Sequence, residues 1–319
     1  MNIRGARLVL VIPPSTGKST GNRVTAERWI DHFRALGADA SVEEEWRGGA
    51  CDVLVALHAT KSLPSIERFL SERPGAPLVV ALGGTDVYGD LAGSGAAQAA
   101  LARASRIVVF QPLAAEELAE ELRERVRTIP QGASPPARSR ARTDRFEVLV
   151  LSHLRSVKDP LLPALAAWEL PPESEIEIVH AGALLDPTMR DEVEQASEHN
   201  PRYTWLGEVP HEEALVLLSR ARLFVLPSRS EGGANVMSEA LAVGVPVLAT
   251  RIPGSVGLLG ADHPGLFPVG EAEVLAKLMS RAETDDRFLQ QLEERSRDLG
   301  SRFTPNRERG GWARLFAEL

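Results

Sequence analysis

The sequence predicts an α/β protein with two doubly wound domains, each built around a parallel sheet. Short, continuous apolar runs alternate with longer amphipathic stretches from residue 7 to residue 123. This alternation stops at QGASPPARSRARTD, residues 131–144, where proline, serine and arginine are typical of a linker. It then restarts and continues almost to the end of the chain. Strands buried on both faces are continuous apolar runs, and amphipathic crossover helices separate them.

The first domain is predicted over residues 1–130. Its strands are the apolar runs RLVLVI, DVLVAL, PLVVAL and RIVVF. Its helices are the amphipathic stretches 21–36, 62–71, 94–103 and 113–123. Cys51, the single cysteine, is interpreted as a small core residue at a strand start.

The second domain is predicted over residues 145–302. Its strands are FEVLVLS, EIEIVH, YTWLG, RLFVLP and VPVLAT, and its helices are 160–170, 187–199, 211–220, 235–243, 271–282 and 286–299. Residues 303–319 form a last helix, whose stripe of Trp312, Leu315, Phe316 and Leu319 predicts packing back toward the first domain. Two such domains create a cleft between the carboxyl edges of their sheets.

Composition excludes several classes of function. A net charge of −8 disfavours nucleic acid as the main partner, and a single cysteine excludes a disulfide within the chain. The N-terminal apolar run ends in prolines and is too short for a signal peptide or a membrane span, and no other stretch approaches twenty apolar residues. We therefore expect a soluble, cytoplasmic protein without membrane contact.

The segment VIPPSTGKSTGNR, residues 11–23, contains letters of a phosphate-binding P-loop. That motif requires a glycine five positions before its Gly-Lys pair, and Ile12 occupies that place. Pro13 and Pro14 also lack the N–H groups that such a loop directs at phosphate. The segment is therefore not a P-loop, although it follows a strand at the sheet edge where α/β proteins bind ligands.

The most informative stretch is RLFVLPSRSEGGANVMSEALAVGVPVLAT, residues 222–250. A buried strand ends before the turn SRSEGG, whose two glycines allow a ligand close to the backbone. A helix then begins near Asn235, whose side chain can cap it, and its free amides form an anion site suited to phosphate. Glu231 lies on the loop before this helix and Glu239 lies one turn inside it, so both are expected near the entrance of the same site. Carboxylates beside a phosphate site suit the neutral hydroxyls of sugars, so we expect a sugar-nucleotide pocket.

This stretch resembles the E-x7-E signature of the GT4-type glycosyltransferases, which have the GT-B fold. The resemblance implies that Glu231 contacts the donor sugar and that Glu239 contacts the ribose hydroxyls. It also implies that Gly232, Gly233, Ala234 and Asn235 bind the sugar and diphosphate, and that residues 207–210, with Gly207, Val209 and Pro210, line the uracil. An isolated E-x7-E would more often be a capped surface helix with two solvated glutamates, but the strand before it, the glycine turn and the apolar continuation VGVPVLAT favour the pocket.

LSHLRSVKDP, residues 151–160, is similar to the family's G-R-L-x-x-x-K segment, whose arginine and lysine neutralise the leaving diphosphate. Lys158 matches the lysine. His153 stands in the arginine's place and Arg155 follows two residues later, so either could contact the β-phosphate. No D-x-D motif indicates Mg²⁺, and neither a metal nor a cofactor is expected.

A narrower resemblance covers nearly the whole chain. TGNRVTAERW, ALHATKS, ALGGTDVY, VHAGALLDP, NPRYTWLGE and RIPGSVGLLG occur in the order typical of the selenosugar synthases of selenoneine biosynthesis. These enzymes join selenophosphate to the sugar of a UDP-sugar, such as UDP-glucose or UDP-GlcNAc, with a carbon–selenium bond. The resemblance implies functional coupling to a selenophosphate synthetase. It leaves the preferred sugar and the product anomer open.

The acceptor is expected on loops of the first domain. Selenophosphate is an anion with a strong nucleophilic atom, so it needs cationic anchoring more than a base. The candidate anchors are Gly21, Asn22 and Arg23 at a helix start, with Lys18 and Lys61 nearby. His58 could hold phosphate or assist P–Se hydrolysis, and Thr85 and Asp86 could bind sugar hydroxyls or orient His58.

Other readings of the same residues remain open. An ordinary glycosyltransferase that acts on a hydroxyl acceptor would need a base and a wider groove. A sugar-nucleotide-binding protein without turnover, or a hydrolysing epimerase on the same fold, would keep the same donor pocket.

Overall fold

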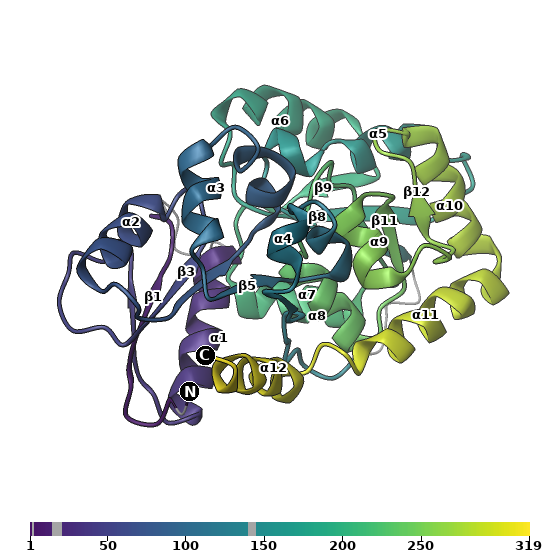
Figure 1. Cartoon of the computed structure of the whole chain (residues 1–319). Helices are drawn as coiled ribbons and strands as arrows, with labels where there is room; N and C mark the ends of the chain where they lie inside the picture. The colour runs from purple at the N-terminus through teal and green to yellow at the C-terminus, as the bar shows by residue number, and fades with distance from the viewer. Residues whose placement is uncertain (2, 15–20, 140–144) are drawn as a thin grey trace. The chain divides into compact units, whose positions relative to one another are not determined.

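The computed structural model describes residues 1, 3–14, 21–139 and 145–319. The chain divides into two compact units, each with a six-stranded parallel sheet (Figure 1). Unit one consists of Met1–Gly132, Glu231–Asn235 and Pro305–Leu319, and unit two of Ala133–Ser230 and Val236–Thr304. The short segment Glu231–Asn235 therefore groups with unit one, although the chain on both sides of it belongs to unit two.

The sheet of unit one has the strand order β2-β1-β3-β4-β5-β6. The strands are β1 (Arg7–Val11), β2 (Asp39–Glu43), β3 (Val53–Leu57), β4 (Leu78–Ala81), β5 (Arg106–Val109) and β6 (Val126–Thr128). From β1 the chain first adds β2 on one side, and it then adds β3, β4, β5 and β6 on the other side. The strand order therefore reverses between β1 and β3. Ligands of open α/β sheets bind at such a reversal, beyond the carboxyl ends of the strands.

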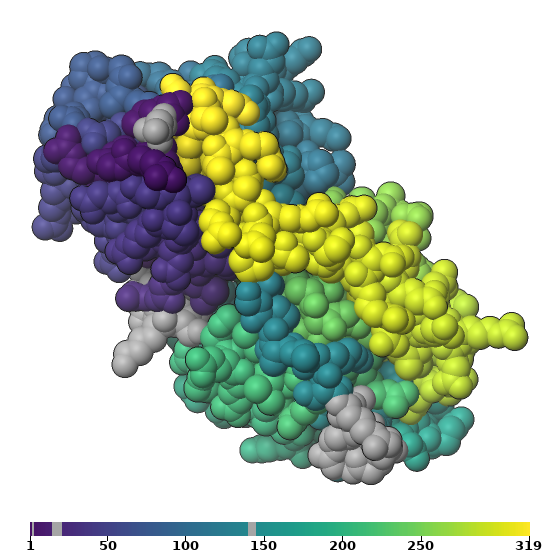
Figure 2. Space-filling view, turned by 90° about the horizontal axis from the view of Figure 1, so that it is seen from below, coloured from purple at the N-terminus to yellow at the C-terminus, as the bar shows by residue number. Residues whose placement is uncertain are grey.

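Helices cover both faces of this sheet. α1 (Gly21–Ala35) and α12 (Pro305–Ala317) pack on one face through Trp29, Phe33, Trp312 and Phe316. The other face is covered by α2 (Leu63–Glu72) and α3 (Gly95–Ala102), and a short α4 (Glu120–Arg123) follows β5. In Figure 2 the yellow end of the chain, α12, lies against the purple N-terminal segments of this unit.

The stripe predicted on the last helix explains its place. Trp312, Leu315 and Phe316 are buried and belong to the core cluster of α1 and the sheet, with Leu319 packed at its margin. The ring centroids of Trp29 and Trp312 are 4.7 Å apart in an edge-to-face contact, which suits the quadrupoles of the two rings. The end of the sequence thus completes the core of the unit that contains its beginning.

The sheet of unit two has the order β12-β11-β10-β7-β8-β9. Its strands are β7 (Phe146–Leu151), β8 (Ile176–Ala181), β9 (Tyr203–Trp205), β10 (Leu223–Leu226), β11 (Val247–Thr250) and β12 (Leu266–Phe267). The order reverses between β7 and β10. The loops that follow these two strands are LSHLRSVKDP and PSRSEGGA, the segments singled out in the sequence.

The helices of unit two are α5 (Leu162–Trp168), α6 (Arg190–His199), α7 (His211–Arg220), α8 (Asn235–Val243), α9 (Pro253–Leu259), α10 (Ala272–Thr284) and α11 (Asp286–Gly300). Asn235, the first residue of α8, is the last residue of the segment that groups with unit one. Within the ranges that the structure describes, no helix is both long and apolar enough to cross a membrane.

One predicted helix is wrong. Residues 113–123 form a 3-10 turn, Pro112–Ala115, and the separate α4. Between them the chain turns, and the guanidinium of Arg123 donates to the carbonyls of Glu116 and Leu118 in place of helical partners. Among the described residues, the structure also has elements that were not predicted: the strands β2, β6 and β12, the helix α9, a π-helical turn at Asp86–Asp90 and the 3-10 turn Ser156–Lys158. β6 and β12 have only three and two residues, and β2 and β6, at the edges of unit one, are only partly apolar.

Candidate active site

Two glycine-containing loops of unit one meet backbone to backbone. A Cβ added to Gly84, in the loop after β4, would lie 2.4 Å from the nitrogen of Gly232. A Cβ added to Gly232 would lie 2.5 Å from the nitrogen of Gly84. These distances are far shorter than van der Waals contact, so both positions require glycine.

The next glycine, Gly233, is equally constrained. Its φ is +149°, and an added Cβ would lie 2.5 Å from the Cβ of Phe110. The sequence interpretation, in which both glycines of SRSEGG let a ligand approach the backbone, stays a prediction, but on the Cβ side of each glycine there is no room. The GGTD loop and Phe110 occupy the space that a Cβ would fill. Through these contacts the two glycines attach the segment Glu231–Asn235 to the rest of unit one.

This docking fixes the carboxylate predicted to contact the sugar. Glu231 is 8% exposed, and it precedes the two docked glycines directly. Ala234, the last residue before α8, is also 8% exposed. A carboxylate largely removed from water requires hydrogen-bond donors, which hydroxyls of a bound sugar can supply together with protein groups.

His58, Thr85 and Asp86 form a compact polar group at the carboxyl ends of β3 and β4. The Nδ1 atom of His58 lies 2.8 Å from Oδ1 of the fully buried Asp86, and its Nε2 lies 2.8 Å from the hydroxyl of Thr85. Asp86 also accepts hydrogen bonds from the backbone N–H groups of Ala59 and Thr60, at 2.7 and 3.2 Å. Of the two roles predicted for Asp86, its contacts fit the orientation of His58.

The His58 ring can therefore carry a proton on either nitrogen. The backbone N–H of Lys61 donates to Nδ1 at 3.2 Å, which requires a lone pair there, whereas a proton on Nδ1 would face Asp86. Asp90 lies 3.7 Å from Nε2 on the other side. The φ of His58 is +78°, a left-handed conformation that costs a non-glycine residue about 1–3 kcal/mol and is concentrated at functional sites.

The predicted acceptor residues are only partly brought together. Gly21 and Asn22 begin α1, and Arg23 is about half exposed and pairs with Glu27 at 3.4 Å. The side chain of Lys61 is exposed next to His58. Lys18 lies outside the described residues. The carbonyl of Gly21 accepts a hydrogen bond from Asn235 at 3.1 Å, a contact that does not use the N–H groups of the helix start.

The predicted diphosphate-binding cations lie in a turn of unit two. Lys158 ends the 3-10 turn Ser156–Lys158, which Arg155 precedes as an exposed residue. Asp159 follows with a left-handed φ of +46°. His153 accepts a hydrogen bond at Nδ1 from the backbone of Ala183 at 3.0 Å, which fixes its ring on the loop.

Arg229 holds this turn and was missed in the sequence. Its backbone N–H donates to the carbonyl of Val157 at 2.9 Å, and its guanidinium lies 2.9 Å from the carboxylate of Asp159. The loop after β10 is thereby fastened to the loop after β7 at the reversal of strand order. Its position two residues before Glu231 is the sequence feature that could have identified it.

The nucleoside end of the predicted donor site also lies in unit two. Glu239, on α8, has a side chain 12% exposed and contacts Nε2 of His211 at 2.8 Å. His211 is the first residue of α7, directly after the segment 207–210. Gly207 has a φ of +75° and its carbonyl accepts from Gly182, whereas Val209 is half-buried and Pro210 exposed. His211 was not singled out in the sequence, although it adjoins the segment predicted to line the base.

Comparisons with known proteins show the family of the chain. Residues 135–299, just over half of the chain, match the model of the glycosyl transferases group 1 family. Glycosyltransferase 1 domain-containing protein 1 of Xenopus tropicalis is 26% identical over 302 residues, which cover 85% of this chain and 87% of that protein.

Solved structures show the same fold. Sucrose-phosphate synthase from Thermosynechococcus elongatus is similar with a TM-score of 0.79 and 16% identity, over 98% of each chain. HepE of Anabaena, in complex with UDP-glucose, is similar with a TM-score of 0.77 and 17% identity, over 98% of this chain and 100% of the other. The predicted fold, two parallel-sheet domains of the GT-B type, is confirmed. The chain belongs to the glycosyl transferases group 1 family.

Proposed function

We propose that this glycosyltransferase moves the sugar of a UDP-sugar, UDP-glucose or UDP-GlcNAc, to selenophosphate and forms a 1-selenosugar. The observation that carries the proposal is the docked segment Glu231–Asn235, which holds a nearly buried carboxylate at the start of α8. A carboxylate in that setting suits sugar hydroxyls, and the amides of a helix start suit phosphate.

We assign the donor roles as the resemblance to GT4-type enzymes implies. Glu231 contacts the sugar, while Lys158 and Arg155 face the diphosphate and Glu239 accepts from the ribose hydroxyls. The Anabaena HepE structures hold UDP or UDP-glucose in the same fold, which supports a uridine donor. Fixed cations and helix amides stabilise the leaving UDP in this proposal, so no metal is needed.

The reaction balances without a further reagent. A selenium lone pair of selenophosphate attacks C1 of the sugar, and the C1–O bond breaks with its electron pair on the β-phosphate of UDP. The product is a sugar with a C1–Se–P linkage. Water then cleaves the P–Se bond and leaves a 1-selenosugar and phosphate, a step in which His58 can carry a proton between water and selenium.

The sequence and the positive charge on unit one support selenophosphate as the acceptor. The blocks TGNRVTAERW, ALGGTDVY and RIPGSVGLLG resemble selenosugar synthases over nearly the whole chain. Arg23 and Lys61 supply exposed positive charge on unit one for a small anion. A nucleophile as strong as selenium needs this anchoring more than it needs deprotonation.

One observation favours a second function, transfer to a hydroxyl acceptor. A hydroxyl needs a base, and His58 beside the buried Asp86 is arranged as one. That enzyme would use the same donor residues and would release UDP with sugars or polyols as acceptors.

UDP release with competing acceptors decides between the two. The wild-type protein is incubated with UDP-glucose or UDP-GlcNAc and with selenophosphate, inorganic phosphate or a panel of sugars. The proposal expects UDP release that depends on selenophosphate and is lost in Glu231→Ala, while this variant still binds UDP. Release with sugars alone supports the second function, and tight UDP binding without release in every mixture would contradict both.

A further inference from the structure

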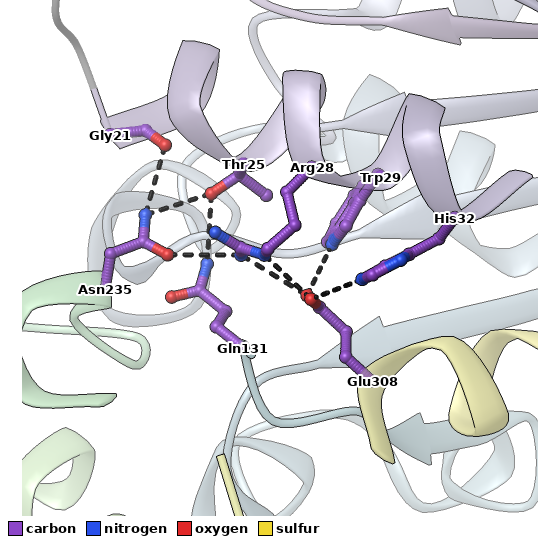
Figure 3. Close-up of polar contacts among 8 residues, drawn as sticks. All are labelled: Gly21, Thr25, Arg28, Trp29, His32, Gln131, Asn235 and Glu308. Carbon is purple, nitrogen blue, oxygen red and sulfur yellow. Dashed lines mark hydrogen bonds and ion pairs between the residues drawn. The ribbon is translucent and has the colours of Figure 1, made fainter. Parts of the chain in front are cut away.

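Glu308 of α12 is a buried carboxylate on which three side chains of α1 converge (Figure 3). Arg28 donates from Nε to Oε2 at 2.7 Å and from Nη2 to Oε1 at 3.3 Å. Trp29 donates its indole N–H at 2.7 Å, and Nε2 of His32 lies 3.0 Å away. The Glu308 side chain has no exposed surface, so these groups replace its water shell.

The carboxylate is charged at neutral pH. Burial alone would raise the pKa of Glu308, but the hydrogen bond from His32 and the positive charge and hydrogen bonds of Arg28 outweigh burial and lower that pKa below its ordinary value. A buried charge of this kind requires its partner, because removal of one member leaves the other uncompensated. Arg28 is therefore fixed by Glu308.

Arg28 uses its fixed position to hold Asn235. The same Nη2 atom donates to Oδ1 of Asn235 at 3.2 Å. The amide nitrogen of Asn235 in turn donates to the carbonyl of Gly21 at 3.1 Å and to the hydroxyl of Thr25 at 3.0 Å. Both polar atoms of the side chain are thus engaged by α1, so the capping role predicted for Asn235 is replaced by an anchoring one.

Asn235 ends the segment Glu231–Asn235, which carries the sugar-contacting carboxylate of the proposed function. One end of the segment is docked by Gly84 and Phe110 against Gly232 and Gly233. Asn235 secures the other end, and its own anchor leads through Arg28 to Glu308 in the last helix of the chain. The residues of this path are 207 and 280 positions apart in sequence.

We infer that Glu308 and Arg28 are positioning residues for the transfer reaction: they hold Asn235, and through it Glu231, in the geometry that the bound sugar requires. Neither side chain needs to contact substrate. This inference rests on the proposed function for its kinetic consequence, but its structural consequence can be measured without turnover.

The guanidinium is required for this task. Arg28 contacts Glu308 with two nitrogens and reaches Asn235 with one of them, a planar fork that a lysine cannot reproduce. Glu308→Gln keeps the shape of the side chain and removes its charge. Arg28→Lys keeps the charge and removes the fork, so the two variants disturb the same path in different ways.

Glu318 provides a matched control. It also lies at the end of the chain and joins it to unit one, since it pairs with Arg106 at 2.9 Å and with Arg127. Its side chain is 36% exposed, and its partners Arg106 and Arg127 belong to β5 and β6, whereas the contacts of Asn235 are with α1. Glu318→Gln therefore weakens the attachment of the C-terminal segment without disturbing the path to Glu231.

Hydrogen exchange of the folded protein tests the positioning directly. In Glu308→Gln and Arg28→Lys, amides of residues 231–235 should exchange at least about tenfold faster than in wild type, while Glu318→Gln leaves them unchanged. Equal protection of this segment in all four proteins would overturn the inference, whether or not the enzyme uses selenophosphate.

Kinetics supply the second readout. With the donor and acceptor that the wild type uses, Glu308→Gln and Arg28→Lys should lower kcat by about 10- to 100-fold with little change in UDP affinity. Arg28→Lys combined with Asn235→Ala should be no slower than Asn235→Ala alone, because Arg28 acts through Asn235. Additive losses would contradict that path. A wild type that releases no UDP with any acceptor would refute the proposed function and leave the exchange result to decide this inference.

Discussion

Gly84 and Gly232 touch through their backbones, and a Cβ on either would lie 2.4 or 2.5 Å from the nitrogen of the other. The contact joins the loop after β4 to the segment that begins with Glu231. Since both loops carry residues assigned to the reaction, the contact sets the position of Glu231 relative to His58, Thr85 and Asp86 within unit one.

Gly84→Ala should abolish most turnover. The added methyl group overlaps backbone atoms that cannot rotate away, so the two loops must separate and Glu231 moves with them. We expect kcat to fall by about 100-fold, as for a displacement of about 1 Å at a reacting centre. Gly95→Ala is the control, because an added Cβ there has nothing within 4 Å, and it should be fully active. Similar activities of the two variants would show that the loops tolerate separation.

Asp86→Asn should impair the chemistry of His58. The buried carboxylate faces Nδ1 at 2.8 Å, and a neutral amide in its place stabilises a proton there less than the charged carboxylate does. We expect kcat to fall by about tenfold or more, part of the roughly 10²- to 10⁴-fold that a positioned acid–base group contributes. Asp90→Asn, at 3.7 Å from the other ring nitrogen and 43% exposed, should have a small effect. If phosphate release from the C1–Se–P intermediate is the step that slows, the role of His58 lies in hydrolysis.

His211→Ala should weaken the binding of UDP. His211 contacts Glu239 at 2.8 Å and orients the carboxylate that is predicted to accept from the ribose. The loss of one such contact should raise the Kd of UDP by about three- to tenfold, as expected for a hydrogen bond between a 12% exposed carboxylate and a histidine that is 39% exposed. Calorimetric titration with UDP measures this, with His199→Ala at the exposed end of α6 as the control. Tighter binding in His211→Ala would mean that the histidine competes with the ribose.

His180 makes the stability of unit two sensitive to acid. Its Nδ1 accepts from the hydroxyl of Tyr203 at 2.7 Å and its Nε2 donates to the carbonyl of Ser152 at 2.8 Å. Burial lowers the pKa of His180 to about 4 from an ordinary 6.5. Between these values the unfolded chain binds a proton that the folded one does not, so stability falls as the pH falls from 6.5 to 4.

The effect of this histidine is on the order of 3 kcal/mol across that window. His180→Gln should be less stable than wild type at pH 8 but should lose less stability on acidification, as measured by denaturant unfolding at several pH values. Part of the slope should remain, because burial also lowers the pKa of His263 to about 4. If the free energy of unfolding of His180→Gln fell with pH as steeply as that of wild type, the His180 ring would not be the cause of the acid sensitivity.

Local pattern was sufficient to predict most of the architecture. The helix 235–243 was predicted with the bounds of α8, because glycines precede it and Gly244 follows it. In the structure Gly244 has a φ of +80°, a left-handed conformation that suits the residue after a helix. The central strands of unit one, β3 and β4, are continuous apolar runs and are buried throughout, whereas β7 of unit two contains the buried Glu147. β2 was missed because only one residue of its DASVE is buried, and an exposed edge strand has no apolar pattern.

Site contacts were predictable where the residues share one segment or follow neighbouring strands, as His58 and Asp86 do. Glu231 and Glu239 stand in a single motif, and Arg155 and Lys158 in another. The contact of Gly84 with Gly232 and the path from Glu308 through Arg28 to Asn235 join residues far apart in the chain. Tertiary packing creates such contacts, and no spacing rule in the sequence encodes them.

The most direct test of the central claim is the bond that the enzyme forms. UDP-glucose or UDP-GlcNAc labelled with ¹³C at C1 is incubated with ⁷⁷Se-labelled selenophosphate and the wild-type protein, and the products are followed by NMR. The account predicts a C1 resonance split by one-bond coupling to selenium, which appears as UDP is released and is absent with Glu231→Ala. UDP released without this coupling, with C1 bonded to oxygen, would contradict it.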